Sequence, residues 1–81
     1  RTSGNTLDLR GMTLSEACDE CDFFFSTMIN DGANGCYLLH GHGTGALKTG
    51  LRRWLPKNGM VSKWKPAPQG EGGDAYTAVM F

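Results

Sequence analysis

Two histidines lie in a glycine-rich segment of the chain, HGHGTG, at residues 40–45. The imidazole of histidine changes charge near neutral pH, so His40 and His42 are candidates for proton transfer. An apolar run precedes the segment, and a basic stretch with helical periodicity follows it. A glycine turn that enters a helix presents backbone N–H groups and the positive end of the helix dipole, which together favour an anion. The segment therefore predicts an anion site with a proton-transfer group beside it.

Asp8, Arg10 and Asp74 extend this chemistry. In a reaction without metal, His40 would act as general acid or base, Asp8 would orient it, and Arg10 would neutralise a phosphorane-like transition state. A water nucleophile would recruit a divalent cation such as Mg²⁺ or Mn²⁺, with Asp8 and Asp74 as oxygen ligands. Zinc would need one of the same carboxylates as a third ligand beside the two histidines. The alternative without chemistry is a strand-end histidine that bonds a loop carbonyl.

The glycines also match part of a dinucleotide-binding fingerprint. Gly41, Gly43 and Ala46 fit G-x-G-x-x-G/A. That fold needs two such halves and an acidic residue about 20 positions further on, whereas the next strand ends in Trp64-Lys65. Dinucleotide binding is therefore kept only as an alternative.

Charge is unevenly distributed along a chain whose formal net charge is zero. Residues 1–36 carry two arginines against six carboxylates, and residues 37–81 carry six cations against two carboxylates. All six of these cations fall within residues 48–65: Lys48, Arg52, Arg53, Lys57, Lys63 and Lys65. One basic side predicts contact with a phosphate backbone, and ordinary solvated faces are the alternative.

The apolar periodicity predicts two helices and four strands. Alternation in NTLDLRG predicts a strand at residues 5–11, and capping-box spacing of Thr13 and Glu16 begins a helix over about 14–30. A second helix over 46–55 ends at a proline. Apolar runs between turn signals predict further strands, at residues 36–40, 60–65 and 75–81, with a loop at 66–74.

This order of elements predicts an α/β fold in two layers, with a four-stranded mixed sheet and both helices on one face. Right-handed crossovers place the helices on the same side, and one sheet face stays open. An antiparallel return of the last strand brings Asp8–Gly11, His40–Gly45 and Glu71–Asp74 to one edge. Ligands of open α/β sheets gather outside the carboxyl ends of the strands.

Length and composition restrict the class of protein. Eighty-one residues with 40% hydrophobic content predict one small globular domain. No apolar stretch approaches the roughly 18–20 residues needed to cross a bilayer, so no membrane partner is expected. Cys18 and Cys21 fall on the apolar face of the first helix, which disfavours a disulfide framework and indicates a reducing compartment. A CDEC redox pair is the alternative, although Cys18 lies about a turn inside the helix.

Two motifs carry a resemblance to a known family. LDLRG at 7–11, followed some thirty residues on by LLHGHGTGAL at 38–47, resembles the Smr (small MutS-related) domain, whose signatures are L-D-x-R/H and H-G-x-G. GEGGDAYTAV at 70–79 resembles the form found at the C-terminus of MutS-like ATPases. The resemblance extends over nearly all 81 residues, with the elements in the family's order.

The resemblance implies a fold similar to the C-terminal domain of translation initiation factor three, with strand order 1-2-4-3 and the last strand antiparallel. The activity it implies is that of a nucleic-acid endonuclease with little sequence preference. Members in MutS-like proteins nick DNA, and relatives tied to pentatricopeptide-repeat proteins or stalled ribosomes cleave RNA. The implied partners are therefore DNA or RNA, with the ribosome as a partner through the parent protein. A non-catalytic nucleic-acid or ribosome-binding module of the same fold is the alternative.

The site residues follow from the two motifs and from the basic segment. The implied catalytic residues are Asp8, Arg10, His40 and His42. His42 occupies the variable position of the second motif, where many members place lysine, so it either contacts phosphate or is a further catalytic histidine. The expected nucleic-acid contacts are Gly41, Gly43, Thr44, Lys48, Arg52, Arg53, Lys63 and Lys65, with Glu71 and Asp74 as secondary residues at the same edge.

The first residues, RTSGNT, include no initiating methionine, which favours excision of this domain from a longer MutS-like protein. An intracellular, reducing compartment is expected, and a plastid is an alternative if the chain comes from a plant or alga.

Overall fold

The computed structural model describes residue 2 and residues 4–81. Within this part of the chain the elements are β1 (Thr6–Asp8), α1 (Leu14–Asn30), β2 (Gly35–Leu39), α2 (Ala46–Trp54), β3 (Lys63–Pro66) and β4 (Tyr76–Met80). Short 3₁₀ turns lie at Leu55–Lys57, Gln69–Glu71 and Gly73–Ala75.

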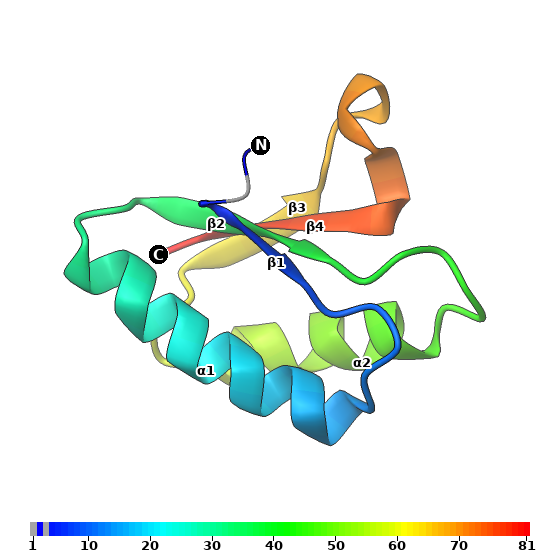
Figure 1. Cartoon of the computed structure of the whole chain (residues 1–81), viewed down its shortest axis with the longest axis horizontal. Coiled ribbons are helices and arrows are strands. Elements are labelled where there is room, and N and C mark those ends of the chain that lie inside the picture. Colours follow the sequence, from blue (N-terminus) through cyan, green and yellow to red (C-terminus); the bar gives the residue numbers. More distant parts are fainter. Residues whose placement is uncertain (1, 3) are drawn as a thin grey trace.

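The strands form one mixed sheet with the order β1-β2-β4-β3. β1 runs parallel to β2, whereas β4 is antiparallel to both β2 and β3. α1 and α2 lie side by side against one face of this sheet, and no α-helix of the described residues lies on the other face (Figure 1). The predicted fold class, strand order and placement of the helices are therefore confirmed.

α1 begins where the sequence predicted. The Thr13 side chain accepts from the Glu16 amide at 3.2 Å, and the Glu16 carboxylate accepts from the Thr13 amide at 2.9 Å. This reciprocal pair satisfies two N–H groups at the helix start. None of the helices in the described part of the chain is both long and apolar enough to cross a membrane.

β3 differs from the predicted strand. The Met60 amide donates to the Asn58 side chain, and the Val61 amide donates to the Asn58 carbonyl, so this part of the predicted strand is a turn. Pro66, expected in the loop, belongs to β3 instead. β3 is an edge strand, where a proline without an N–H is tolerated.

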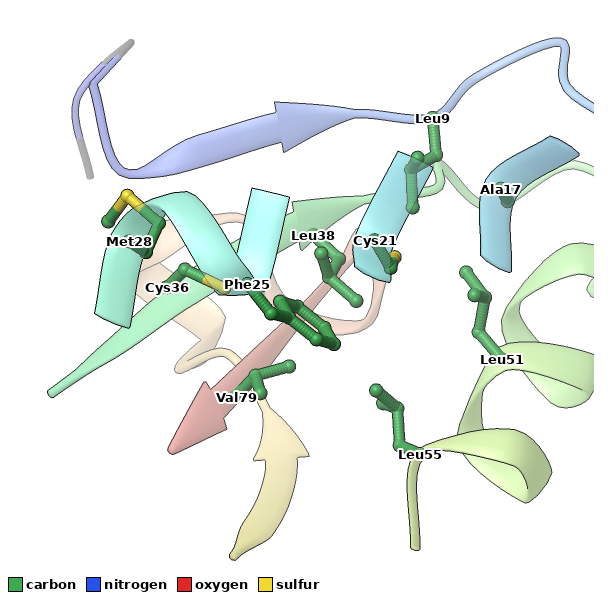
Figure 2. Packing of buried hydrophobic residues seen from close by; sticks show 10 residues of the cluster. All are labelled: Leu9, Ala17, Cys21, Phe25, Met28, Cys36, Leu38, Leu51, Leu55 and Val79. Atoms are coloured by element: carbon green, nitrogen blue, oxygen red, sulfur yellow. The ribbon is translucent and has the colours of Figure 1, made fainter. Parts of the chain in front are cut away.

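The core lies between the helices and the sheet, with Phe25 at its centre (Figure 2). The Phe25 ring stacks on Trp54 at a centroid distance of 6.4 Å and meets Phe81 edge-on at 5.5 Å. The helices approach closely at Gly50, where a Cβ atom would lie 2.6 Å from Leu14 Cδ2. Glycine at this position therefore permits the packing that holds α2, and with it the loop that follows β2.

Candidate nucleic-acid site at the carboxyl ends of the strands

The three segments that were expected to converge meet at one edge of the sheet. The Leu9 amide donates to the Leu39 carbonyl at 2.8 Å, which joins the ends of β1 and β2. The His40 and Gly41 amides both donate to the Ala75 carbonyl, at 3.2 and 3.0 Å, which joins the end of β2 to the segment before β4. The predicted convergence is therefore confirmed for the ends of β1 and β2 and for the residues directly before β4.

The chain between β2 and α2 forms a loop at residues 41–45, here called the glycine loop. Positive φ angles of +77°, +44° and +83° occur at Gly41, Gly43 and Gly45. This backbone region favours glycine because a Cβ atom would be strained there. With the residues after β1 and the first turn of α2, the loop lines a hollow of about 190 Å³. His42 and Thr44 are exposed on the loop, so this hollow is open to a ligand.

His40, at the end of β2, is buried, with only 6% of its surface exposed. Its Nδ1 lies 2.9 Å from the Gly41 carbonyl oxygen, and its Nε2 lies 2.8 Å from Thr77 Oγ1. A carbonyl oxygen accepts only, so Nδ1 carries a proton and donates it. Burial is the largest cause that lowers the pKa of His40 below its usual 6.5. His40 is therefore a neutral ring whose Nε2 accepts the hydroxyl proton of Thr77.

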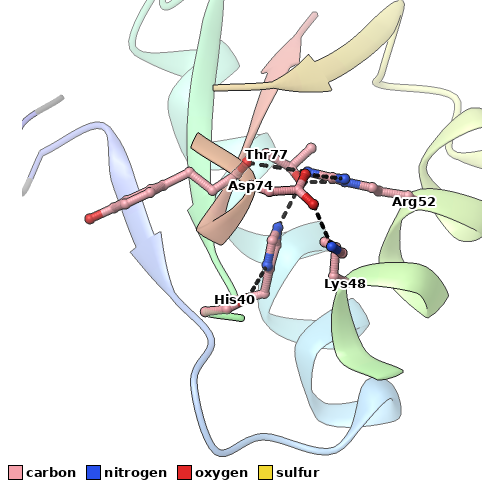
Figure 3. Close-up of polar contacts among 7 residues, drawn as sticks. His40, Lys48, Arg52, Asp74 and Thr77 are labelled. Atoms are coloured by element: carbon pink, nitrogen blue, oxygen red, sulfur yellow. Dashed lines mark hydrogen bonds and ion pairs between the residues drawn. The ribbon is translucent and has the colours of Figure 1, made fainter. Parts of the chain in front are cut away.

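Thr77 also connects this ring to α2 (Figure 3). Its Oγ1 accepts from Arg52 Nε at 2.8 Å while its hydroxyl donates to His40. Arg52 Nη1 donates to Asp74 Oδ1 at 2.8 Å, and Lys48 Nζ pairs with Asp74 Oδ2. Hydrogen bonds from Lys48 and then Arg52 lower the pKa of Asp74 to about 2. These five residues form one connected polar network, here called the His40–Asp74 network.

The network changes the expected roles of two cations. The Arg52 side chain is only 14% exposed, and its guanidinium also stacks over the Trp64 ring at 5.0 Å from the centroid. Lys48 is 24% exposed and bound to Asp74. Asp74 binds both cations in this conformation, so the expected contact of Lys48 and Arg52 with phosphate stays a prediction that would need them to share or release Asp74.

Asp8 and Arg10 form an exposed pair next to the glycine loop. Arg10 Nη2 donates to Asp8 Oδ2 at 2.8 Å, and Arg10 Nε donates to Asp8 Oδ1 at 3.0 Å. Hydrogen bonds from Arg10 lower the pKa of Asp8 to about 2. The expectation that Asp8 orients His40 is wrong, because both ring nitrogens of His40 bind other groups. A Cβ atom on Gly41 would lie 3.5 Å from Arg10 Cγ, so the stem of Arg10 lies against the first residue of the loop.

The other predicted contacts lie on different surfaces. Arg53 is exposed on α2, whereas Lys63 and Lys65 are exposed on β3 and alternate with the half-buried Trp64. Glu71 is exposed at the end of the 3₁₀ turn Gln69–Glu71. The basic segment of the sequence is thus divided between the helix layer and the open side of the sheet.

The histidine, cysteine and acidic side chains are the groups that a metal site or a redox pair would use. Among residue 2 and residues 4–81, no group of three or more histidine, cysteine or acidic side chains lies close enough to hold a metal ion. Cys18, Cys21 and Cys36 are free thiols. Burial raises the pKa of Cys18 and of Cys21, the opposite of what a reactive CDEC pair needs.

Thr77 is a residue of this network that was not predicted from the sequence. Alternation in AYTAVMF puts Thr77 and Val79 on the same face of β4. The polar side chain of Thr77 should therefore be buried and should need a hydrogen-bond partner. The helical period also separates the two arginines of α2. With about 100° per residue and Leu51 facing the core, Arg52 lies beside the apolar face and Arg53 opposite it.

The comparisons agree with the fold and with these motifs. A family model described as Smr domain matches residues 7–81. The chain belongs to the Smr domain family, which confirms the resemblance seen in the two motifs. The crystal structure of the Smr domain of Thermus thermophilus MutS2 matches with a TM-score of 0.89 and 39% identity, over 94% of this chain and 95% of that one. YdaL, a stand-alone small MutS-related protein from Escherichia coli, matches with a TM-score of 0.87 at 20% identity, over 99% of this chain and 66% of that one, and shows the same fold.

Curated relatives are much longer than this chain. It is 42% identical over 73 residues to the endonuclease MutS2 of Anaeromyxobacter sp., which is 90% of this chain and 9% of that protein. It is 40% identical over 78 residues to the endonuclease MutS2 of Enterococcus faecalis, which is 96% of this chain and 10% of that protein. The chain therefore spans about a tenth of the length of these relatives.

Proposed function

We propose that this chain is a nucleic-acid endonuclease domain that cleaves DNA or RNA with little sequence preference. The observation that carries the proposal is the exposed Asp8–Arg10 pair, with the Arg10 stem against Gly41 at the start of the glycine loop. A guanidinium next to backbone N–H groups at a helix start is a site for one phosphate of a nucleic-acid backbone. The names of the longer relatives, endonuclease MutS2, support the same activity.

Each residue of this site has a proposed role. Arg10 neutralises charge on the phosphoryl group, and Asp8 holds the guanidinium in place through two contacts. His42 is exposed on the loop and transfers the proton. His40 positions the loop, because its Nδ1–H holds the Gly41 carbonyl while Thr77 holds its Nε2. His40 would act as a base only after giving up its contact with Thr77.

The nucleophile separates two routes. Attack by a 2′-hydroxyl restricts cleavage to RNA, needs no metal, and leaves a cyclic phosphate as the leaving oxygen takes a proton. Attack by water allows DNA, and a divalent cation would then help to ionise the water. Asp8 and Asp74 are the proposed oxygen ligands, although each is bound to cations in this conformation. Cleavage in the presence of EDTA separates these routes.

The experiment is a time course on end-labelled single-stranded DNA and RNA. Arg10→Gln and Asp8→Asn are each expected to reduce the cleavage rate by at least about a hundredfold, since both act on the phosphoryl group. Lys57→Gln is the matched control, because it removes an exposed cation in the 3₁₀ turn after α2, outside this site. Full activity of Arg10→Gln would contradict the assignment.

The second candidate is a non-catalytic binding module of the same fold. The burial of His40, with both nitrogens engaged, favours it. Retained nucleic-acid binding without cleavage by the wild-type chain would select this candidate. Two further expectations stay predictions. One is contact with the ribosome through a parent protein, and the other is location in a reducing compartment.

A further inference from the structure

The open face of the sheet carries aromatic and basic side chains together. Its register places three rows on this face, side by side across the strands. The middle row is Thr6, Tyr37, Ala78 and Lys65. The row nearest the candidate site is Asp8, Leu39 and Tyr76, and the far row is Gly35, Met80 and Lys63.

The middle row borders a shallow hollow. Its volume is about 240 Å³, and Tyr37, Lys65 and Met80 line it over the small side chain of Ala78. Tyr37 is half-buried and Lys65 is exposed. A flat ring could therefore lie in the hollow beside an aromatic side chain, with an ammonium group at its edge.

The charges on this face select the class of ligand. Asp8 is neutralised by Arg10, whereas Lys63 and Lys65 are exposed and form no ion pair among the described residues. Cations on the same face as aromatic rings favour a polyanion whose bases are free to stack. A duplex presents phosphates but keeps its bases stacked inside, so it would use the lysines without the tyrosines.

The open face is continuous with the candidate site. Asp8 belongs to the row nearest that site, and Tyr76 in the same row lies close enough to Arg10 to affect its pKa. The middle row is two residues further along the strands, about 7 Å away at the usual rise of a strand. A strand of nucleic acid that leaves the site can thus cross this face.

We propose that the open face is a stacking platform for single-stranded nucleic acid, with bases on Tyr37 and Tyr76 and phosphates on Lys63 and Lys65. This inference rests on the proposed nuclease function, because a platform for single strands makes single-stranded nucleic acid the substrate of the site at the glycine loop. Nothing in the family match or the names of the relatives assigns this face a role.

The test is a binding titration by fluorescence anisotropy with labelled dT12, rU12 and a 12-base-pair DNA duplex. Tyr37→Leu keeps an apolar side chain but removes the ring. It is expected to weaken binding of both single strands by at least about fivefold, the low end for one lost base–aromatic stack. Duplex affinity is expected to change less than about twofold. Phe23→Leu is the matched control, because Phe23 is 75% exposed on α1 in the helix layer and should not contact the ligand.

The lysines give a second readout. Lys65→Gln is expected to lower the slope of log K against log salt by about 0.7 for a single strand. Lys57→Gln, an exposed lysine in the 3₁₀ turn after α2, is expected to leave that slope unchanged.

Two results would overturn the platform. One is a folded Tyr37→Leu chain that binds single strands as tightly as the wild type. If that variant does not fold, photocrosslinking of the wild type to an oligonucleotide with 5-iodouracil decides. Crosslinks at Tyr37 or Tyr76 support the platform, and crosslinks confined to α2 refute it. The two proposals fail separately. If Tyr37→Leu weakens binding but the wild type does not cleave, only the proposed nuclease is refuted. If the wild type cleaves and Tyr37→Leu changes neither cleavage nor binding, only the platform is refuted.

Discussion

Thr77→Val removes the hydroxyl that joins β4 to β2 and α2 while keeping the shape of the side chain. Thr77 is fully buried, and its Oγ1 makes two contacts of 2.8 Å, to His40 Nε2 and to Arg52 Nε. A buried polar group left without a partner costs about 1–3 kcal/mol. His40 Nε2 would bear this cost in full, whereas Arg52 keeps its contacts with Asp74 and with the Tyr76 carbonyl.

The expected loss in the free energy of unfolding is therefore about 1–3 kcal/mol. At roughly 0.05–0.15 kcal/mol per residue, the whole domain has about 4–12 kcal/mol, so the loss is a large share. The melting temperature should fall by roughly 4–24 °C, since each kcal/mol shifts a domain of this size by about 4–8 °C.

The assay is urea unfolding followed by tryptophan fluorescence, because Trp54 packs on the core ring of Phe25. The midpoint should fall at an unchanged m-value. Thr49→Val is the matched control, because Thr49 is exposed on α2, and it should change stability by less than about 0.5 kcal/mol. Thr77→Ser keeps the hydroxyl and should lose only about 1 kcal/mol for the missing methyl group. A Thr77→Val chain as stable as Thr49→Val would refute the network.

Three further predictions follow from the same geometry. Stability should fall as the pH is lowered below about 6.5, because His40 takes up a proton in the unfolded chain but resists protonation where it is buried in the folded chain. Urea midpoints at pH 7.5 and 5.0 measure this fall, and His40→Gln should lose this part of it. Gly41→Ala should cost about 1–2 kcal/mol because φ is +77° there, whereas Gly59→Ala, with open space around it, should be close to neutral in the same assay. Iodoacetamide should modify Cys18 first and the fully buried Cys21 only as the chain unfolds, which mass spectrometry of the two separated peptides can follow.

The fold was predictable because its signals are local. Thr13 and Glu16 are three residues apart, and their capping box begins α1 at the expected position. The alternation in the strands and the glycine turns after them predicted that the strand ends converge. β3 was placed too early because Asn58 binds the amides of Met60 and Val61, and such turn contacts are not evident from apolar periodicity.

The candidate site was only partly predictable because its decisive contacts are distant in the sequence. The bond from His40 to Thr77 joins residues 37 apart, and the one from Arg52 to Asp74 joins residues 22 apart. Sequence spacing identified which kinds of side chain lie at this edge. It could not show that Asp74 binds Lys48 and Arg52, the cations that were expected to contact phosphate. Which charges remain available depends on side-chain packing between α2 and β4.

The most direct test of the central claim, that His42 rather than His40 transfers the proton, is the single-turnover cleavage rate of a labelled single-stranded oligonucleotide by His42→Gln. His42 is exposed, so this variant should keep the urea midpoint of the wild type. The predicted rate is lower than that of the wild type by at least about a hundredfold, the low end for a lost acid–base group, with oligonucleotide affinity changed by less than about threefold. A full cleavage rate in a folded His42→Gln chain would contradict the claim. His40 would then be the candidate for the general base.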